Sequence, residues 1–144
     1  YEGGIRVPFI VNQPGMVPIQ TLDNLIYFPD MMPTLAALAK GTKHLPKQIN
    51  GINILPLFYG KQVDTDNRLL YWEFPGKQRA ARKGDWKCIT IHPNQPLELY
   101  NLKEDPEETN NLAKKYPRRV KEFDEEMQRM HIPTPNWPQP GEQF

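Results

Sequence analysis

The segment "IRVPFIV", residues 5–11, constrains the fold more than any other part of this 144-residue chain. Its apolar side chains follow one another with little alternation, as they do in a strand buried on both faces of a parallel sheet. Such a strand needs hydrogen-bonding neighbours on both sides, because buried backbone groups without partners are costly. The chain supplies no neighbour of matching type. We therefore expect residues 1–62 to be the trailing, incomplete part of a larger α/β domain.

A helix is predicted within this first part by "PDMMPTLAALAKG", residues 29–41. Asp30 is a good N-cap, Pro33 fits the first turn, and Gly41 suits the position just after the last turn. We expect irregular chain to follow, with a short helical turn near residues 55–59. The apolar face expected for the helix consists of Leu35, Leu38 and Ala39.

Residues 63–132 have a different character and predict a small antiparallel sheet packed on a helix. The segment "RLLYWEF" indicates a strand, "RAARKGDWKCITI" a hairpin turning at Gly84, and "LELYNL" a further strand. The segment "YPRRVKEFDEEMQRM" predicts an amphipathic helix, with Pro117 in its first turn and a favourable pair between Glu125 and Arg129. Its apolar stripe consists of Val120, Phe123, Met127 and Met130.

The remaining residues 133–144 form a Pro-rich tail, which we expect to be extended and held by Trp137. The fold class expected for the whole chain is α+β. It comprises the end of an α/β domain over residues 1–62, then a sheet of about four strands with a C-terminal helix over residues 63–132.

Composition excludes several classes of function. The net charge of +1 provides no long-range attraction to nucleic acid or to an anionic membrane, and no apolar stretch approaches the ~20 residues of a membrane helix. The three histidines are isolated, and the single Cys88 cannot form an internal disulfide or a cysteine-cluster metal site. Phosphate-loop, dinucleotide-binding and nucleophile-elbow motifs are absent. We therefore predict no nucleic-acid partner and no membrane partner.

The aromatic residues of the predicted sheet leave two interpretations open. Beside Arg79 and Arg82 they could form a wall on which sugars stack, or they could fill the core of the sheet. We favour the core, because aromatic side chains are the usual filling of such small cores. The residues concerned are Tyr71, Trp72, Phe74 and Trp86.

Four motifs occur in one order along the chain: "EGG-x-RVP", "D-x-x-PT", "R-x-G-x-W-K" and "LY-x-L-x-x-DP-x-E-x-x-NLA". In order and spacing they resemble the C-terminal part of the formylglycine-dependent sulfatases, of the arylsulfatase, N-acetylgalactosamine-6-sulfatase and N-sulfoglucosamine sulfohydrolase type. The resemblance extends to about Met130. It implies an alkaline-phosphatase-like α/β domain followed by a small sheet subdomain, sulfuric ester hydrolase activity in the parent protein, and an extracytoplasmic location.

The resemblance also implies a formylglycine made in a C/S-x-P-x-R motif and a calcium ion, both in an N-terminal catalytic domain. Neither transfers to this chain. Cys88 is not followed by the Pro and Arg of the motif, and Asp23-Asn24 lacks the glycine-containing surroundings of the metal motif. The lysine that the family uses in catalysis lies just upstream of "EGG". We therefore expect no catalytic and no metal-binding residue here, and no activity from this chain alone.

Two groups of residues are still candidates for an indirect role. Because the small subdomain of the family contributes to the substrate pocket, the pocket candidates are the strand-end and loop residues Trp72, Glu73, Gln78 and Arg79. Glu2 and Arg6 are candidates for an ion pair at the rim of the active site. Simple surface charges are an equally good interpretation of that pair.

The expected partners are the missing N-terminal catalytic domain and a sulfated carbohydrate. Two alternatives stay open. Residues 63–132 could be a free-standing carbohydrate- or partner-binding module. The chain could also assemble as a homo-oligomer by pairing its exposed strand at residues 5–11 with a second copy.

Overall fold

The computed structural model describes residues 1–74, 78–92, 94–136, 138 and 143. Its contacts divide the chain into two units, one made of residues 1–7 with 68–144 and the other of residues 8–67. The first seven residues fold with the C-terminal unit. The division expected from the sequence, at residues 62 and 63, stays a prediction.

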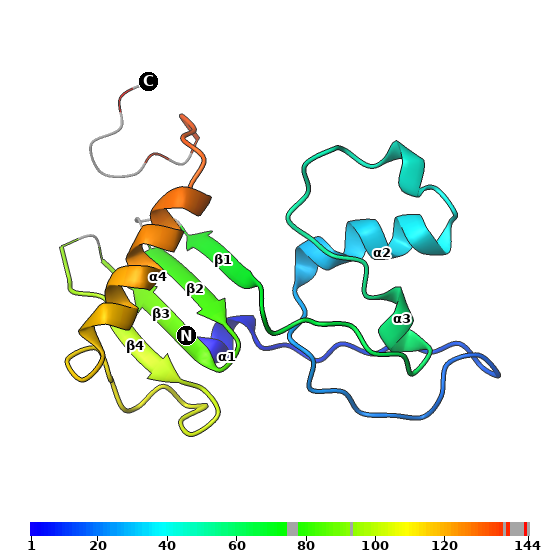
Figure 1. Cartoon of the computed structure of the whole chain (residues 1–144), viewed down its shortest axis with the longest axis horizontal. Helices are drawn as coiled ribbons and strands as arrows, with labels where there is room; N and C mark the ends of the chain where they lie inside the picture. Colours follow the sequence, from blue (N-terminus) through cyan, green and yellow to red (C-terminus); the bar gives the residue numbers. More distant parts are fainter. Residues whose placement is uncertain (75–77, 93, 137, 139–142, 144) are drawn as a thin grey trace. The chain divides into compact units, whose positions relative to one another are not determined.

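The C-terminal unit is built on a four-stranded antiparallel sheet (Figure 1). Its strands are adjacent in space in the order in which they occur in the chain, and each strand pairs antiparallel with the next. This confirms the small sheet that the sequence predicted. The strands are β1 (Leu69–Phe74), β2 (Gln78–Lys83), β3 (Trp86–Thr90) and β4 (Glu98–Asn101).

The tight hairpin between β2 and β3 also follows the prediction. Lys83 pairs with Trp86, which leaves Gly84 and Asp85 as the two loop residues. Gly84 has a φ of +55°, in the left-handed region that glycine enters without steric cost. The hairpin turn therefore fixes the register of β2 against β3, and Arg82 stands opposite Lys87.

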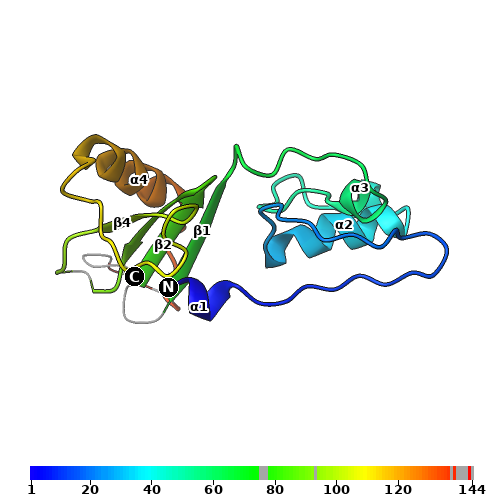
Figure 2. The ribbon, with the colours of Figure 1, turned by 90° about the horizontal axis from the view of Figure 1, so that it is seen from below.

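Helix α4 (Pro117–Met130) covers one face of the sheet, and the one-turn helix α1 (Glu2–Ile5) lies on the opposite face (Figure 2). Pro117 occupies the first turn as expected. Phe123 and Met127 are buried against the sheet, so the amphipathic stripe is confirmed at its centre. The core on this face consists of Ala81, Cys88, Leu99, Phe123 and Met127.

The predicted pair between Glu125 and Arg129 is wrong, because each residue pairs with another one. The Arg129 guanidinium lies 2.5 Å from the Glu126 carboxylate, and the Lys121 ammonium lies 3.8 Å from the Glu125 carboxylate. All of these side chains are largely exposed, so either pairing contributes little and small rotamer preferences decide between them.

The strand predicted at residues 5–11 is not formed. Ile5 ends α1, and residues 6–13 have no regular secondary structure. Val7 and Ile10 are 72% and 86% exposed, which is the reverse of the burial expected for this segment. No described strand lies alongside to receive its hydrogen bonds, and Pro8 has no N–H to donate.

The second unit contains short helices joined by irregular chain. Both the helix expected at residues 29–41 and the turn expected near residues 55–59 are confirmed. The backbone at Gly51 lies close to the backbone at Pro29. A Cβ at residue 51 would lie 2.0 Å from the Pro29 carbonyl oxygen. The elements are η1 (Phe28–Asp30), α2 (Met31–Leu38), η2 (Thr42–His44) and α3 (Leu55–Phe58).

Asp30 precedes α2, as predicted, but its side chain does not cap this helix. Its carboxylate accepts hydrogen bonds from the backbone N–H groups of Tyr27 and Ile52, both at 2.9 Å. Thr34 acts in the same way, with its hydroxyl oxygen accepting the N–H of Ile54 at 3.0 Å. These buried side chains join loops that are distant in sequence, and that competing use of the carboxylate explains the missing cap.

Two further details of α2 differ from the prediction. Lys40, with a φ of +56°, takes the left-handed position after the helix, and the N–H of Gly41 bonds to the carbonyl of Ala36 at 2.7 Å. The face predicted to be apolar is exposed, and the helix buries Pro33 and Thr34. The exposed residues of the predicted face are Leu35, Leu38 and Ala39. The predicted anchor Trp137 lies outside the described residues.

Candidate functional site

The N-terminal turn is attached to the sheet by buried charges. Glu2, in α1, is only 7% exposed. One of its carboxylate oxygens lies 3.0 Å from the ammonium of Lys87 in β3, and the other lies 3.1 Å from the guanidinium of Arg82 in β2. Residues about 80 positions apart in the sequence therefore meet on one face of the sheet.

Glu108 completes this arrangement from the loop after β4. One oxygen of its carboxylate lies 2.8 Å from the Lys87 ammonium, and the other accepts the backbone N–H of Glu2 at 2.5 Å. We call these four residues the Lys87 cluster. It contains two carboxylates and two cations, so its charges balance. The members of the Lys87 cluster are Glu2, Arg82, Lys87 and Glu108.

Strand alternation and one organised loop place these groups. Lys87 and Cys88 are neighbours in β3, so Lys87 faces α1 while Cys88 faces the core under α4. The loop that carries Glu108 is ordered by Asp105, whose carboxylate accepts the backbone N–H groups of Asn110 at 2.8 Å and Thr109 at 3.1 Å. These two hydrogen bonds lower the pKa of Asp105, and the bond from Asn110 has the larger effect.

Tyr1 adds a second attachment beside the Lys87 cluster. Its hydroxyl donates a hydrogen bond to the Glu98 carboxylate at 2.9 Å, and its ring meets that of Tyr100 edge-on, with the ring centres 6.4 Å apart. The hydroxyl of Tyr100 donates to the same carboxylate oxygen. Burial, followed by the bonds to Glu98, raises the pKa of both Tyr1 and Tyr100, so both phenols act as donors.

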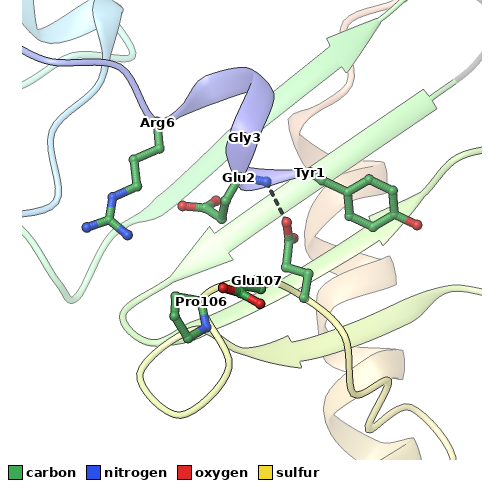
Figure 3. Close-up of a pocket in the computed structure, with 7 residues that line it drawn as sticks. Tyr1, Glu2, Gly3, Arg6, Pro106 and Glu107 are labelled. Carbon is green, nitrogen blue, oxygen red and sulfur yellow. Dashed lines mark hydrogen bonds between the residues drawn. The ribbon is translucent and has the colours of Figure 1, made fainter.

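A pocket of ≈ 350 Å³ opens between α1 and the turn that precedes Glu108 (Figure 3). Figure 3 shows Tyr1 and Arg6 at opposite ends of α1, above Pro106 and Glu107. The predicted ion pair between Glu2 and Arg6 is not formed, because Lys87 and Arg82 hold the Glu2 carboxylate. The pocket is lined by Tyr1, Glu2, Gly3, Arg6, Pro106, Glu107 and Glu108.

The sequence analysis did not identify Lys87 and Glu108 as members of a site. One signal was present, since Lys87 interrupts the otherwise apolar strand "WKCITI" at a position that the sheet must bury. A buried lysine requires an opposite charge. The sequence could not show that its partners come from α1 and from the loop after β4.

The four predicted pocket residues do not form one surface. In the β1–β2 register, Glu73 pairs with Arg79 on the face covered by α4, whereas Trp72 and Gln78 belong to the opposite face. Glu73 accepts a hydrogen bond from the Tyr71 hydroxyl, and its carboxylate lies 2.6 Å from Nδ1 of His131 at the end of α4. The sheet therefore separates the candidates into two pairs.

Arg79 is also engaged with α4. Its guanidinium lies 3.8 Å from the carboxylate of Asp124. Together with the contact between Glu73 and His131, this pair fastens the helix to the edge of the sheet formed by β1 and β2. The described contacts of Glu73 and Arg79 are therefore made within the unit.

The aromatic residues divide between the two interpretations. Tyr71 and Trp86 pack against the core under α4, and Trp86 meets Tyr116 edge-on with ring centres 5.3 Å apart. Phe74 is 64% exposed. The core interpretation is therefore right for Tyr71 and Trp86, and it is wrong for Phe74.

The described residues do not fit a metal ion or an activated cysteine. Among them, no group of three His, Cys, Asp or Glu side chains is arranged to hold a metal. Burial raises the pKa of the Cys88 thiol to about 12, which suppresses the reactive thiolate. No helix within the described residues has both the length and the apolar character needed to cross a bilayer.

The second unit has an apolar pocket of its own, of ≈ 410 Å³. Its walls are the irregular segment after α1 and the exposed sides of α2 and α3. Tyr59 is the one titratable residue among those that line this pocket, which is a recess in a mainly apolar surface. Its apolar lining includes Phe9, Ile10, Val11, Leu35, Leu38, Leu55 and Phe58.

Comparison with known proteins identifies the family. Residues 1–132 match the family described as "N-sulphoglucosamine sulphohydrolase, C-terminal". An uncharacterized sulfatase of Schizosaccharomyces pombe is 34% identical over 130 residues, which cover 81% of this chain and 23% of that protein. An N-acetylgalactosamine-6-O-sulfatase of Bacteroides thetaiotaomicron is 30% identical over 139 residues, covering 87% of this chain and 27% of that protein.

A solved structure supports the same assignment. A protein from the glycosaminoglycan metabolism of Bacteroides thetaiotaomicron superposes with a TM-score of 0.58 at 28% identity, over 69% of this chain and 24% of the other. The chain thus spans about a quarter of the length of the relatives it matches. It belongs to the N-sulphoglucosamine sulphohydrolase C-terminal family and is a C-terminal sulfatase domain.

Proposed function

We propose that the protein containing this chain is an extracytoplasmic sulfatase that hydrolyses sulfate esters of sugars. In that protein, the chain completes the fold of the catalytic domain and contributes to the substrate pocket. The names of the relatives support the substrate class, since one acts on 6-O-sulfated N-acetylgalactosamine and another belongs to glycosaminoglycan metabolism. The chain alone is inactive, because no described residue provides a nucleophile or a metal site.

The observation that carries this proposal is the apolar surface of residues 8–67. Proteins that work as isolated monomers rarely expose large contiguous apolar patches. Here large apolar side chains are exposed along the irregular segment, along the predicted apolar face of α2 and at η1. The exposed residues are Phe9 (48%), Ile10 (86%), Ile19 (107%), Phe28 (88%), Leu35 (57%) and Leu38 (52%).

A catalytic α/β domain upstream would supply what this surface lacks. Strands of that domain would pair with residues 7–11, and its helices or loops would cover Leu35 and Leu38. The relatives are about four times longer than the chain, which leaves room for such a domain. Burial of these side chains is worth roughly 25 cal/mol for each Å² removed from water.

Within the substrate pocket, the proposal assigns the recognition role to Trp72 and Gln78. Both belong to the sheet face that is not covered by α4. Glu73 and Arg79 instead have partners on or next to α4. Loops and strand ends on a rigid scaffold are the usual places for substrate contacts.

The free-standing module is a weaker alternative. A module of residues 63–132 would lack Glu2, so Lys87 would keep only one of its two carboxylate partners. The cost of a partly paired buried ammonium counts against independent folding of that segment.

Sulfatase assays on the whole protein and on this chain test the proposal. The substrates are an aryl sulfate, N-acetylgalactosamine 6-sulfate and N-sulfoglucosamine. We expect the whole protein to release sulfate, and we expect the chain to release none above the background. The control is the whole protein with Ala in place of the Cys or Ser of its C/S-x-P-x-R motif. Turnover by the chain, or no turnover by the whole protein on any substrate, contradicts the proposal.

A further inference from the structure

We propose that Lys87 and Glu108 are positioning residues that fix the N-terminal turn α1 on the sheet, and that Lys87 controls catalysis without touching the substrate. The first statement depends only on contacts within this chain. The catalytic consequence rests on the proposed function, because it requires the chain just before Glu2 to contribute to the active site. The two statements can therefore fail separately.

Burial distinguishes this cluster from ordinary surface ion pairs. The side chain of Lys87 is 0% exposed, and those of Glu108 and Glu2 are 1% and 9% exposed. A buried ammonium is tolerated only when opposite charges lie close to it. By contrast, the pair between Lys121 and Glu125 on α4 has side chains that are 79% and 55% exposed, and its atoms are 3.8 Å apart. That pair fixes no other element.

The cluster fixes the direction of α1 as well as its distance from the sheet. The side chain of Glu2 is held by Lys87 and Arg82, while its backbone N–H is held by Glu108. Glu2 is therefore held at two groups, its carboxylate and its backbone N–H, by partners on two strands and one loop. These three contacts leave the residue little freedom to rotate. The bond from Tyr1 to Glu98 adds a further point of attachment next to it.

The backbone at Glu108 supports a positioning role. Its φ of +56° lies in the left-handed region, which is unfavourable for a residue other than glycine. Such strain persists only where the surroundings enforce it. Here that conformation accompanies a carboxylate that reaches both Lys87 and the N–H of Glu2.

The test uses the whole protein and measures amide hydrogen exchange in the peptide that contains α1. Lys87→Met should raise exchange there by about tenfold or more, because the turn would open locally. Lys87→Arg keeps the charge and should raise it less. Lys121→Met is the matched control, which removes an exposed lysine and should leave exchange of α1 unchanged. Wild-type protection of α1 in Lys87→Met, or equal losses in Lys87→Met and Lys87→Arg, overturns the positioning role.

A second variant covers the case in which Lys87→Met fails to fold. Glu2→Ala leaves the pair of Lys87 with Glu108 in place inside the sheet unit. We expect it to raise the exchange of α1 and to leave β3 protected. Unchanged exchange of α1 in Glu2→Ala contradicts the proposal.

Kinetics test the catalytic consequence. Lys87→Met should lower kcat with KM within about twofold, since uniform substrate binding is unaffected. Lys87→Arg should recover part of kcat, and Lys121→Met should match the wild type. Normal kcat in a Lys87→Met protein that has lost the protection of α1 contradicts the catalytic consequence alone. A wild-type protein without sulfatase activity contradicts the proposed function, and the exchange experiment still decides the positioning role.

Discussion

The two units of this chain differ in the kinds of side chain that they bury. The unit of residues 1–7 and 68–144 has an apolar core under α4 and pairs its buried charges within itself. In the unit of residues 8–67, several of the most buried side chains are polar, and large apolar side chains remain exposed. The first unit therefore has the means to fold from its own sequence, whereas the second leaves large apolar side chains in contact with solvent.

The interior of the second unit shows what holds it in place of an apolar core. Asp30, Thr34 and Thr65 are 0–1% exposed, and each side chain accepts backbone N–H groups from another segment. Such bonds specify the path of loops, but each contributes only about 1 kcal/mol to stability. We expect the unit to have a defined shape and low stability.

The largest expected effect concerns the buried charges of the first unit. Lys87→Met in this chain leaves the two buried carboxylates with Arg82 as the remaining cation of the Lys87 cluster, and should cost about 3–5 kcal/mol of unfolding free energy. Denaturant unfolding followed by tryptophan fluorescence measures this cost. The control is the triple variant Glu2→Gln, Lys87→Met, Glu108→Gln, which removes three of the four cluster charges, leaves only the partly exposed Arg82, and should recover most of the loss. A loss below about 1 kcal/mol for the single variant would place Lys87 among ordinary surface residues.

The apolar core provides the next comparison. Met127 is 0% exposed, so Met127→Ala should cost about 2–5 kcal/mol through lost burial and the cavity left behind. Met130, at the end of the same helix, is only partly buried, and Met130→Ala should cost less. Thermal unfolding of the two variants decides this, and equal losses would show that α4 does not pack as the structure has it.

Gly51 tests the second unit through its backbone. A Cβ at this position would lie 2.0 Å from the Pro29 carbonyl oxygen, so Gly51→Ala must displace the chain. We expect a loss of roughly 1–3 kcal/mol in the second unit. Gly41→Ala is the matched control, because its Cβ would lie 3.8 Å from the nearest atom. Proton chemical shifts of residues 27–34 would report the displacement, and identical spectra for the two variants would contradict it.

Leu35 should respond differently in the chain and in the whole protein. In the chain it is 57% exposed, so Leu35→Ala should change stability by no more than about 0.5 kcal/mol. If upstream strands and helices cover it, the same change in the whole protein should cost about 2–5 kcal/mol. Paired melting curves give the comparison. Equal small effects in both proteins would contradict the proposal that an upstream domain covers Leu35.

The smallest expected effect on stability concerns Cys88, whose reactivity towards a thiol reagent can be measured directly. With a pKa raised by burial to about 12, its thiol should not react with a disulfide reagent at neutral pH unless the first unit unfolds. The thiol of the folded state then keeps its proton at a pH where that of the unfolded state, with its ordinary pKa of 9.0, loses it. Stability should therefore fall as the pH rises from about 9 towards 12. Rapid labelling in native buffer would contradict this burial.

The sequence predicted the elements of the first unit well because their causes are local. Gly84 in a two-residue turn, Pro117 at a helix start and the stripe of Phe123 and Met127 act over a few residues. The family motifs were equally readable. The Lys87 cluster was not, because its members meet only after the sheet has formed.

The failures in the second unit have another cause. Periodicity correctly marks residues 5–11 and Leu35 as apolar, yet it cannot say which surface will cover them. Where no partner strand is described, the segment stays irregular and the side chains stay exposed. The Asp30 carboxylate is buried and joins two loops instead of capping a helix. The neighbouring sequence predicts the cap, because it carries no information about the distant loop.

Amide hydrogen exchange of this chain, resolved by peptide, tests the difference between the two units most directly. We predict slow exchange in β1 to β4, α4 and α1, at the level set by unfolding of the first unit. Residues 8–67 should exchange at least about tenfold faster, because their opening costs less free energy. Equal protection of the two units, or stronger protection of residues 8–67, would contradict the account.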